Sequence, residues 1–309
     1  MNNKVLHITN GSSLTQRLKV LQFKGEFLTW HEMLCEGPTV LNIDSEAFIS
    51  TRELFLKQYY NLEYKHEEFK AELDKFNHLE QYEEVILWFE YDLFCHINLI
   101  AIISLLLQKG LKTPLKLVCS GRVEGQKGLK SLPELNSHQL KNHYKNRVTL
   151  KASDLDLAKQ CWTIYNSDNH NNFKPLIVTT SSFKYLTNCL KAHLKRFPDS
   201  RSGLGTLEFN ILKLIKEREI KSLHHLLGYA LNYQGYYGFG DLQLKRLIKR
   251  LEQFYTINKN KVTINREGDL VLLHLKNVHN TIENNMRYGG ISKYKHLFNK
   301  KENKLYKTV

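Results

Sequence analysis

The sequence predicts an α/β fold with a Rossmann-like N-terminal domain, a helical bridge and a C-terminal domain that resembles a winged helix-turn-helix. Strand-length apolar runs alternate with helical patterns up to residue 122, which is typical of a parallel sheet covered by helices on both faces. The strand patterns then fade, and three helical patterns and a hairpin pattern follow residue 200. We expect an α/β domain at 1–122, a mostly helical bridge that completes it at 123–200, a winged-helix-like domain at 201–275 and a basic tail at 276–309.

Short apolar runs mark the strands of the first domain. We expect these strands at residues 5–9, 27–30, 85–89 and 115–119. Helical periodicity lies between them, at 14–21, in two pieces of 45–79, and in a strongly apolar stretch at 93–108. Strands that alternate with helices imply a parallel sheet, although its strand order is not encoded in this pattern.

The second half of the chain is predicted to be mostly helical. Helices at 152–165 and 183–197 form the bridge. Three further helices are expected at 206–218, 222–233 and 241–254, with Thr206 and Asp241 as the N-caps of the first and third. A hairpin with a polar, basic tip at 258–261 and a short helix at 267–274 follow. Three helices with a hairpin wing are the layout of a winged helix-turn-helix.

The net charge of the chain is divided unevenly along its length. The chain has 309 residues, 45 Lys and Arg and 31 Asp and Glu, for a net charge of +14. The first 100 residues contain 9 basic and 16 acidic side chains, whereas residues 101–309 contain 36 and 15. A composition with 42% hydrophobic and 25% charged residues excludes collagen, coiled coil and wholly disordered chains. The basic excess therefore favours a nucleic-acid partner only for the later part of the chain.

The sequence contains no pattern that indicates secretion, a membrane span, a disulfide framework or a structural zinc site. No N-terminal secretory pattern is recognised, and the longest apolar stretch, at 99–107, is too short to cross a bilayer. The five cysteines form no Cys-x-x-Cys pair, so neither a disulfide framework nor a structural zinc site is indicated. We therefore expect a cytoplasmic protein with reduced thiols and no membrane partner.

Polar residues follow the carboxyl ends of the predicted strands, where parallel α/β sheets bind ligands. The glycine and two serines at 11–13 precede a helix and could hold the phosphate or carboxylate of a small anionic ligand, although a tight turn and helix cap would use the same residues. Arg52 could meet the anion or form a structural salt bridge. The candidate ligand-binding residues are Asn10, Gly11, Ser12, Ser13, Trp30, Glu36, Gly37 and Arg52.

Acidic and imidazole groups near the third strand could carry chemistry. Glu90 and Asp92 could bind a metal ion or act as a general base, and either could cap the helix that starts at residue 93. His7 or His96 could serve as proton partner, or be a structural residue of the core. The candidate catalytic residues are His7, Glu90, Asp92 and His96. The residue pattern specifies neither a cofactor nor a particular metal.

The third C-terminal helix has basic residues at helical spacing, which could form one cationic face for phosphate contacts in DNA or RNA. Lysines at the hairpin tip would add contacts with the phosphate backbone of the nucleic acid, as expected of a wing. The alternatives are a solvated charged face or a protein-interaction module. The candidate nucleic-acid-binding residues are Gln243, Lys245, Arg246, Lys249, Arg250, Lys259 and Lys261.

Three spaced motifs resemble a known bacterial family. The residues from His7 to Ser12, Trp30 with Glu36-Gly37-Pro38, and the run from Leu87 to Leu93 are similar to the domain of unknown function 1835 family over about the first 120 residues. This chain has Ser12 where the family often has an acidic residue, and Cys95-His96 where it often has Asp-Gln. The resemblance implies a Rossmann-like fold and no particular reaction.

Two functions from different classes follow from these features. In the first, the basic C-terminal region associates with nucleic acid while the α/β cleft binds a small anionic ligand. In the second, the chain is an enzyme that acts on a phosphorylated or nucleotide-like substrate, with carboxylates and a histidine as acid-base or metal-binding groups. A protein-interaction module is the third alternative.

Overall fold

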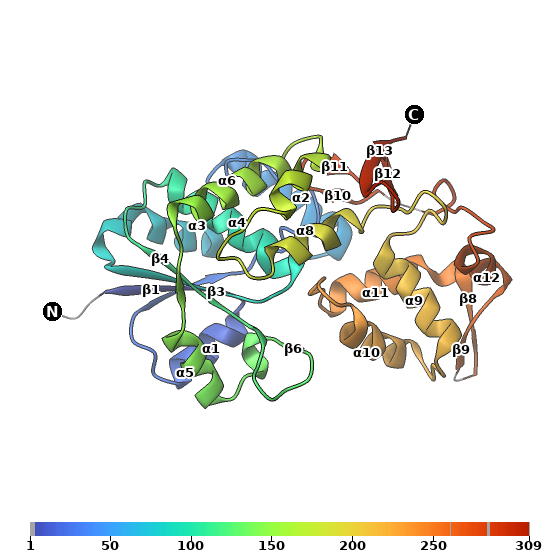
Figure 1. The fold of residues 1–309 in the computed structure, drawn as a ribbon, viewed down its shortest axis with the longest axis horizontal. Helices are drawn as coiled ribbons and strands as arrows, with labels where there is room; N and C mark the ends of the chain where they lie inside the picture. The colour runs from blue at the N-terminus through green and yellow to red at the C-terminus, as the bar shows by residue number, and fades with distance from the viewer. Residues whose placement is uncertain (1–3, 260, 283–284, 309) are drawn as a thin grey trace.

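A five-stranded sheet forms the centre of the N-terminal half (Figure 1). The computed structural model of the chain describes residues 4–259, 261–282 and 285–308. The strand order is β2-β1-β3-β4-β7, and the first four strands are parallel while β7 pairs antiparallel with β4. The strands are β1 Val5–Asn10, β2 Glu26–Trp30, β3 Glu84–Phe89, β4 Leu115–Cys119 and β7 Val148–Thr149. The predicted α/β class with a largely parallel sheet is confirmed, and β7 is an edge strand that the sequence pattern did not predict.

Helices cover both faces of this sheet (Figure 1). On one face, Leu14, Leu18 and Leu140 pack with Ile86 and Trp88 of β3. The helices of this face are α1 Ser12–Val20 and α5 Ser137–Lys145. The helices α2 Glu46–Tyr60, α3 His66–Asp74 and α4 Leu93–Gln108 lie on the other face, and α6 Ala152–Tyr165 and α8 Leu186–Leu194 pack against α4. Shorter elements are η1 Lys75–Gln81, β5 Gly121–Arg122, β6 Leu129–Lys130, η2 Leu132–Glu134, η3 His170–Asn172 and α7 Phe173–Ile177.

The helix α4 is the central helix of the second layer. Its residues from Leu93 to Leu106 are almost all buried, because α6 and α8 cover the side that faces away from the sheet. A helix that is apolar on every side is stable only when it is surrounded in this way. Despite its hydrophobicity, neither this helix nor any other in the described part of the chain is long and apolar enough to cross a membrane.

The C-terminal region starts with three helices and a hairpin. Its elements are α9 Thr206–Glu217, α10 Leu223–Tyr233, α11 Asp241–Arg250, η4 Glu252–Phe254, β8 Tyr255–Asn258, β9 Lys261–Ile264 and α12 Arg266–Leu272. Thr206 and Asp241 are the first helical residues, and Gly205 and Gly240 occupy the cap positions, so the two predicted N-caps are wrong. Asn260, in the expected basic tip of the hairpin, lies outside the described residues.

The last segment folds back onto the rest of the molecule rather than forming a free tail. It forms two short antiparallel pairs, β10 Arg287–Tyr288 with β11 Ile291–Ser292 and β12 His296–Asn299 with β13 Lys304–Lys307. Phe298 and Leu305 are buried. Lys293 is only 1% exposed and forms an ion pair with Glu208 of α9. The basic charge of this segment therefore belongs partly to the interior.

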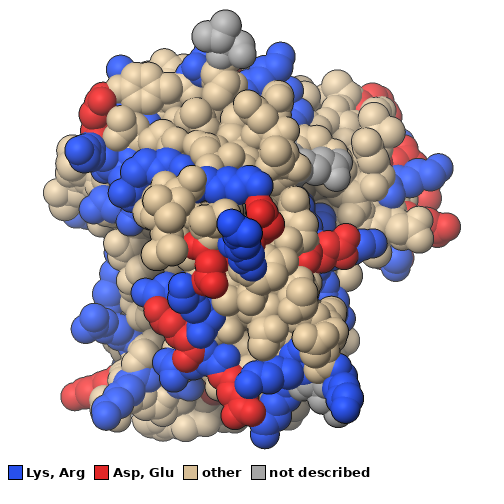
Figure 2. Space-filling model, turned by 90° about the vertical axis from the view of Figure 1, so that its right-hand side faces the viewer, with Lys and Arg blue, Asp and Glu red and all other residues tan. Residues whose placement is uncertain are grey.

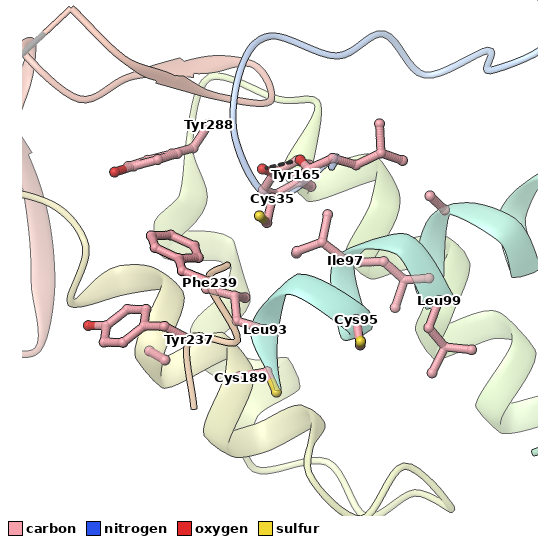
Figure 3. Packing of buried hydrophobic residues seen from close by; sticks show 14 of the residues in the cluster. Cys35, Leu93, Cys95, Ile97, Leu99, Tyr165, Cys189, Tyr237, Phe239 and Tyr288 are labelled. Atoms are coloured by element: carbon pink, nitrogen blue, oxygen red, sulfur yellow. Dashed lines mark hydrogen bonds between the residues drawn. The ribbon is translucent and has the colours of Figure 1, made fainter. Parts of the chain in front are cut away.

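The two halves of the chain share one hydrophobic core. Figure 3 shows Tyr237 and Phe239, from the segment before α11, beside Leu93 at the start of α4, with Tyr288 of β10 nearby. The backbone N–H of Leu93 donates to the Tyr236 carbonyl at 2.8 Å. This packing seats the C-terminal helices against the carboxyl edge of the sheet, which is where the candidate site lies.

Candidate functional site

The strand order places a crossover point between β1 and β3. The chain leaves β1 to form β2 on one side and later forms β3 on the other side. Loops that diverge in opposite directions leave a crevice at the carboxyl ends of two such strands, and α/β proteins bind ligands there. Asn10 ends β1, Glu90 directly follows β3, and Asp92 lies at the start of α4. The structure therefore brings together three of the residues that the sequence predicted.

Two carboxylates and a thiol meet in this crevice. One ligand atom from each of Glu90, Asp92 and Cys95 lies within 4.8 Å of the other two. Asp92 is the N-cap of α4, because its Oδ1 accepts a hydrogen bond from the Cys95 backbone N–H at 2.8 Å. The cap fixes the side chain of Asp92 at the start of α4. Glu90 is half-buried, whereas Asp92 is buried.

Burial and mutual repulsion favour the protonated forms of these acids. Burial raises the pKa of Glu90 above its ordinary value, and the neighbouring Asp92 carboxylate raises it further. Burial also raises the pKa of Asp92, although hydrogen bonds from the backbone N–H groups at the start of α4 oppose this shift. Two carboxylates this close repel each other when both are ionised. A proton or a bound cation between them relieves this repulsion.

The thiol of Cys95 is not poised as a nucleophile. Burial raises the pKa of Cys95 well above its ordinary value, and the charges of Asp92 and Glu90 act in the same direction. Asn10 Nδ2 donates a hydrogen bond to Cys95 Sγ at 3.1 Å. Cys95 therefore remains a neutral thiol at physiological pH, and a reactive thiolate would need a positive neighbour that this arrangement lacks.

A buried asparagine of α4 fixes the other side of the crevice. Asn98 Nδ2 donates to Asn10 Oδ1 at 2.8 Å and to the Glu32 carbonyl at 2.6 Å. Its Oδ1 accepts from the Leu34 backbone N–H at 3.2 Å. Asn98 thus holds the end of β1 and the loop after β2 in fixed positions. Asn98 was not among the predicted site residues, although a lone amide within an apolar helix can mark a buried polar site.

Residues of the C-terminal region line the crevice on the side opposite the sheet. A cavity of about 430 Å³ is lined on the sheet side by Asn10, Glu90 and Asp92, and on the opposite side by residues at the start of α11, including Gly240 and Asp241. The lining residues include no Lys or Arg within the described ranges. The cavity is therefore acidic, and an anion enters it favourably only with a cation or with protonated carboxylates.

The N-terminus of α4 offers little to an anion, because its amides have partners. The Leu93 and Phe94 backbone N–H groups donate to the carbonyls of Tyr236 and Tyr237, and the Cys95 N–H donates to Asp92. The glycine and serines at 11–13 do not line the cavity, and Ser12 and Ser13 are exposed in the first turn of α1. The predicted anion cradle and the carboxylates thus form separate parts of the sheet edge.

The two predicted catalytic histidines have different surroundings. His7 is fully buried within β1 among the residues of the α1 face. Its Nδ1 accepts from Trp88 Nε1 at 3.0 Å and its Nε2 donates to the Lys24 carbonyl at 3.1 Å, while burial lowers its pKa. Both ring nitrogens are therefore occupied, and His7 is a structural residue outside the cavity.

His96 lies in the first turn of α4, and burial keeps it neutral. Its Nδ1 donates to the Asp92 carbonyl at 2.9 Å, and burial lowers its pKa to about 4. Its Nε2 is buried without a hydrogen-bond partner among the described residues. His96 does not line the cavity, so in this structure it supports the first turn of α4.

Three further ligand candidates hold the loop after β2. The guanidinium of Arg52 is buried and donates to Glu32 Oε2 at 3.0 Å and to the Glu36 carbonyl at 2.8 Å. Glu36 pairs with Arg246 of α11 at 2.6 Å. Gly37 has a φ of +85°, and a Cβ there would lie 2.5 Å from the ring of Phe55. These three residues therefore have structural roles, and none of them lines the cavity.

The predicted nucleic-acid face is divided by the fold. Arg246 pairs with Glu36, and Arg250 pairs with the buried Glu208, so both guanidinium groups face the interior. The side chain of Gln243 is also buried, where its Oε1 accepts from the Gly240 backbone N–H at 3.0 Å. A single basic face that contains all four cationic residues of α11 is therefore not present.

Four lysines of this set remain on the surface. They are Lys245 and Lys249 on α11, and Lys259 and Lys261 on the hairpin. Lys245 lies 3.9 Å from Asp241, which is a weak surface pair. Figure 2, a view of the side where the C-terminal region lies, shows Lys and Arg interspersed with Asp and Glu rather than one continuous basic patch.

In comparisons with known proteins, no protein-family model matches this chain, and no curated protein matches it.

Proposed function

We propose that the cavity between β1, β3 and α11 is the active site of an enzyme that binds a divalent cation through Glu90 and Asp92 and acts on a phosphorylated or nucleotide-like substrate. The observation that carries this proposal is the approach of Glu90, Asp92 and Cys95 within 4.8 Å at the crossover point of the sheet. A cation there would neutralise the two acids and attract the phosphate that the cavity itself repels.

The donor set favours an oxygen-preferring cation. Glu90 and Asp92 supply carboxylate oxygens, and the Asn10 amide oxygen is engaged by Asn98. The set contains one sulfur, that of Cys95, and no imidazole lines the cavity in the described ranges, so it is not the cysteine- and histidine-rich set that zinc prefers. Mg²⁺ and Mn²⁺ bind through few carboxylates and keep several waters, which suits an open cavity of about 430 Å³.

A binding measurement tests the metal site without knowledge of the substrate. Titration calorimetry with Mn²⁺ should show one site per chain, weakened about tenfold or more by Glu90→Gln and by Asp92→Asn. Asparagine also caps helices, so Asp92→Asn keeps the start of α4. Glu80→Gln is the control, because Glu80 is exposed and distant in the fold. Unchanged Mn²⁺ affinity in Glu90→Gln would show that the carboxylates do not form the site.

A second measurement tests the catalytic part of the proposal. We expect a library of nucleotides and sugar phosphates to contain a compound that the chain converts only when Mg²⁺ or Mn²⁺ is present. Glu90→Gln should abolish this conversion while Glu80→Gln leaves it intact. Conversion that survives Glu90→Gln would contradict the assignment of the active site.

As a second candidate, we propose that the exposed lysines of α11 and the hairpin contact nucleic acid, with three helices and a wing arranged as a winged helix-turn-helix. The observation that favours it is the exposure of Lys245 and Lys249 one turn apart on α11. Changing both to Glu should reduce salt-sensitive retention on DNA or RNA. The control changes Lys141 and Lys145 to Glu, an exposed pair with the same spacing on α5. Equal retention in both variants would contradict this role.

The resemblance of the first 120 residues to the domain of unknown function 1835 family remains a prediction. It supports the Rossmann-like reading of the sheet and favours neither of the two functions.

A further inference from the structure

A second cavity lies at the carboxyl end of β4 and shares no lining residue with the cavity that contains Glu90 and Asp92. Its walls come from three separate parts of the chain: β4 with the turn that follows it, the end of α5, and the segment that leads into α8. Its volume is about 210 Å³. Drug-sized ligands occupy pockets of about 300–1,000 Å³, so this cavity has the size of a small ion or of one functional group of a larger ligand.

Contacts between the three segments fix the shape of this cavity. The backbone N–H of Arg122 donates to the hydroxyl of Tyr185 at 3.0 Å, which joins the turn after β4 to the segment before α8. Gly121 has a φ of +152°, and a Cβ there would collide with the same hydroxyl. On the α5 side, the Nδ2 of Asn146 donates to the Oδ1 of Asn142 at 3.0 Å. The walls are therefore held together by the fold itself.

A buried hydroxyl without a partner lies at this cavity. Ser120 directly follows β4 and is one of the lining residues. It is 1% exposed, and its Oγ has no hydrogen-bond partner among the described residues. Buried polar groups in folded proteins are almost always hydrogen-bonded, because leaving one without a partner is destabilising. The Ser120 hydroxyl thus marks a place where a ligand atom can complete a hydrogen bond.

The charge of the lining is positive. Arg122 and Lys184 line the cavity, and no Asp or Glu does so within the described ranges. Neither cation forms an ion pair with a described acidic residue. The Lys184 ammonium lies 5.5 Å from the ring centroid of Tyr185, which is itself a lining residue. Burial and the carboxylates of the proposed cation site raise the pKa of Cys119, whereas Lys184 lowers it, so the ammonium charge acts on this inner wall.

The end of α5 contributes a small charge of the opposite sign. Asn142 and Asn146 line the cavity at the C-terminus of this helix. A helix C-terminus acts as about half a negative elementary charge, and this effect is confined to the last turn. The two full positive charges of Arg122 and Lys184 exceed it. The net field in the cavity therefore favours an anion.

We infer that this cavity is a binding site for phosphate, either as the free ion or as the phosphoryl group of a small phosphomonoester. The Ser120 hydroxyl donates to one phosphate oxygen, and the side chains of Arg122 and Lys184 neutralise the charge. A carboxylate has one charge and two oxygens, whereas a phosphate dianion has two charges for the two cations and more oxygens for donors from separate walls. The site goes beyond the proposed cation site, because neither Glu90 nor Asp92 lines it.

Three probes test the nature of the ligand by titration calorimetry at constant ionic strength and in chelator. Inorganic phosphate should bind at one site per chain, and acetate should bind at least about tenfold more weakly. Methyl phosphate that binds as tightly as phosphate would assign the site to phosphomonoesters, whereas binding of phosphate alone would assign it to the free ion. Because the chelator removes divalent cations, failure of the proposed cation site leaves these expected results unchanged.

Two variants with matched controls test the residues. Ser120→Ala removes only the hydroxyl oxygen and should weaken phosphate binding several-fold, whereas Ser104→Ala, at another buried serine, should leave it unchanged. Lys184→Gln should weaken it about tenfold. Lys191→Gln removes the same charge at an exposed position of α8 outside the cavity and should bind phosphate as the wild type does. No saturable binding of phosphate, or equal affinities in the two variants and their controls, would overturn the assignment.

Discussion

Gly238 lies against the Asp92 carboxylate: a β-carbon at Gly238 would be 2.1 Å from the carboxyl carbon of Asp92. Gly238 belongs to the loop before α11, and Asp92 caps the helix that follows β3. The contact joins the C-terminal helices to the carboxylate cluster at the sheet edge. A loop that must approach a carboxylate so closely leaves no space for a side chain, and the following residues then form the opposite wall of the cavity.

Comparing Gly238→Ala with Gly235→Ala should separate the effect of the contact with Asp92 from the effect of backbone strain. Gly235, in the same loop, also has a positive φ of +70° but has open space around its Cβ position. Gly235→Ala therefore measures the backbone strain alone, about 1 kcal/mol. Gly238→Ala should lower the free energy of unfolding by about 1–2 kcal/mol more, measured by denaturant titration, because the loop must also move away from Asp92. Equal losses in the two variants would show that the loop adjusts without disturbing the site.

The raised pKa of Glu90 gives a pH dependence of stability. Below its ordinary pKa of 4.5, the carboxyl group is protonated in both the folded and the unfolded chain. Above that pH the unfolded chain releases its proton first, so the folded state loses stability as the pH rises through the interval up to the raised pKa. Glu90→Gln removes this loss and should raise the free energy of unfolding by roughly 1–2 kcal/mol at alkaline pH in the absence of divalent cations.

The same variant should change stability little at acidic pH, where the wild-type carboxyl group is already neutral. Glu80→Gln, at an exposed position, should follow the wild-type pH profile throughout. Thermal unfolding at several pH values in chelator gives both profiles. Parallel profiles for wild type and Glu90→Gln would indicate that Glu90 titrates as an exposed acid does.

Local sequence patterns correctly predicted the helices and strands whose apolar residues form a continuous run or a helical period. The continuous apolar runs of β3 and α4, and the helical periodicity of α1, α9 and α10, suffice for these assignments because each depends on residues close in the sequence. The edge strand β7 was not predicted, since Val148–Thr149 is too short to show alternation. It is defined by its partner in β4, which a local pattern does not contain.

The candidate site was predicted in part, because its residues follow the ends of strands that were themselves predicted. Asn10, Glu90 and Asp92 are found together because ends of adjacent parallel strands always meet at one edge. The separate roles of Arg246 and Lys249 were not predictable, since both are basic residues on one helix. Only the position of Glu36, far away in the sequence, makes one of them an interior residue. Net charge along a sequence does not distinguish solvated from paired cations.

Asn98 should be essential to the crevice. Asn98→Leu conserves volume but leaves the Asn10 amide oxygen, the Glu32 carbonyl and the Leu34 N–H without their partner. We expect a loss of about 2–4 kcal/mol in the free energy of unfolding, because several buried polar groups are left unpaired at once. Ser104→Ala, at another buried polar position of α4, should cost less than about 1 kcal/mol. A loss no larger than that of the control would contradict the holding role of Asn98.

Arg246 and Lys249 should respond oppositely in stability and in nucleic-acid retention. Arg246→Met leaves the carboxylate of Glu36, which is 1% exposed, without its cation, and should lower the free energy of unfolding by about 3 kcal/mol. Lys249→Met, at an exposed position, should change it by less than about 0.5 kcal/mol. If the surface of α11 contacts nucleic acid, Lys249→Met reduces salt-sensitive retention on DNA or RNA although the chain is fully folded. Arg246→Met, measured at a low temperature at which it is folded, shows the same retention as the wild type. The reverse order would place the nucleic-acid contact at the buried pair and contradict the division of α11 into an interior and a surface face.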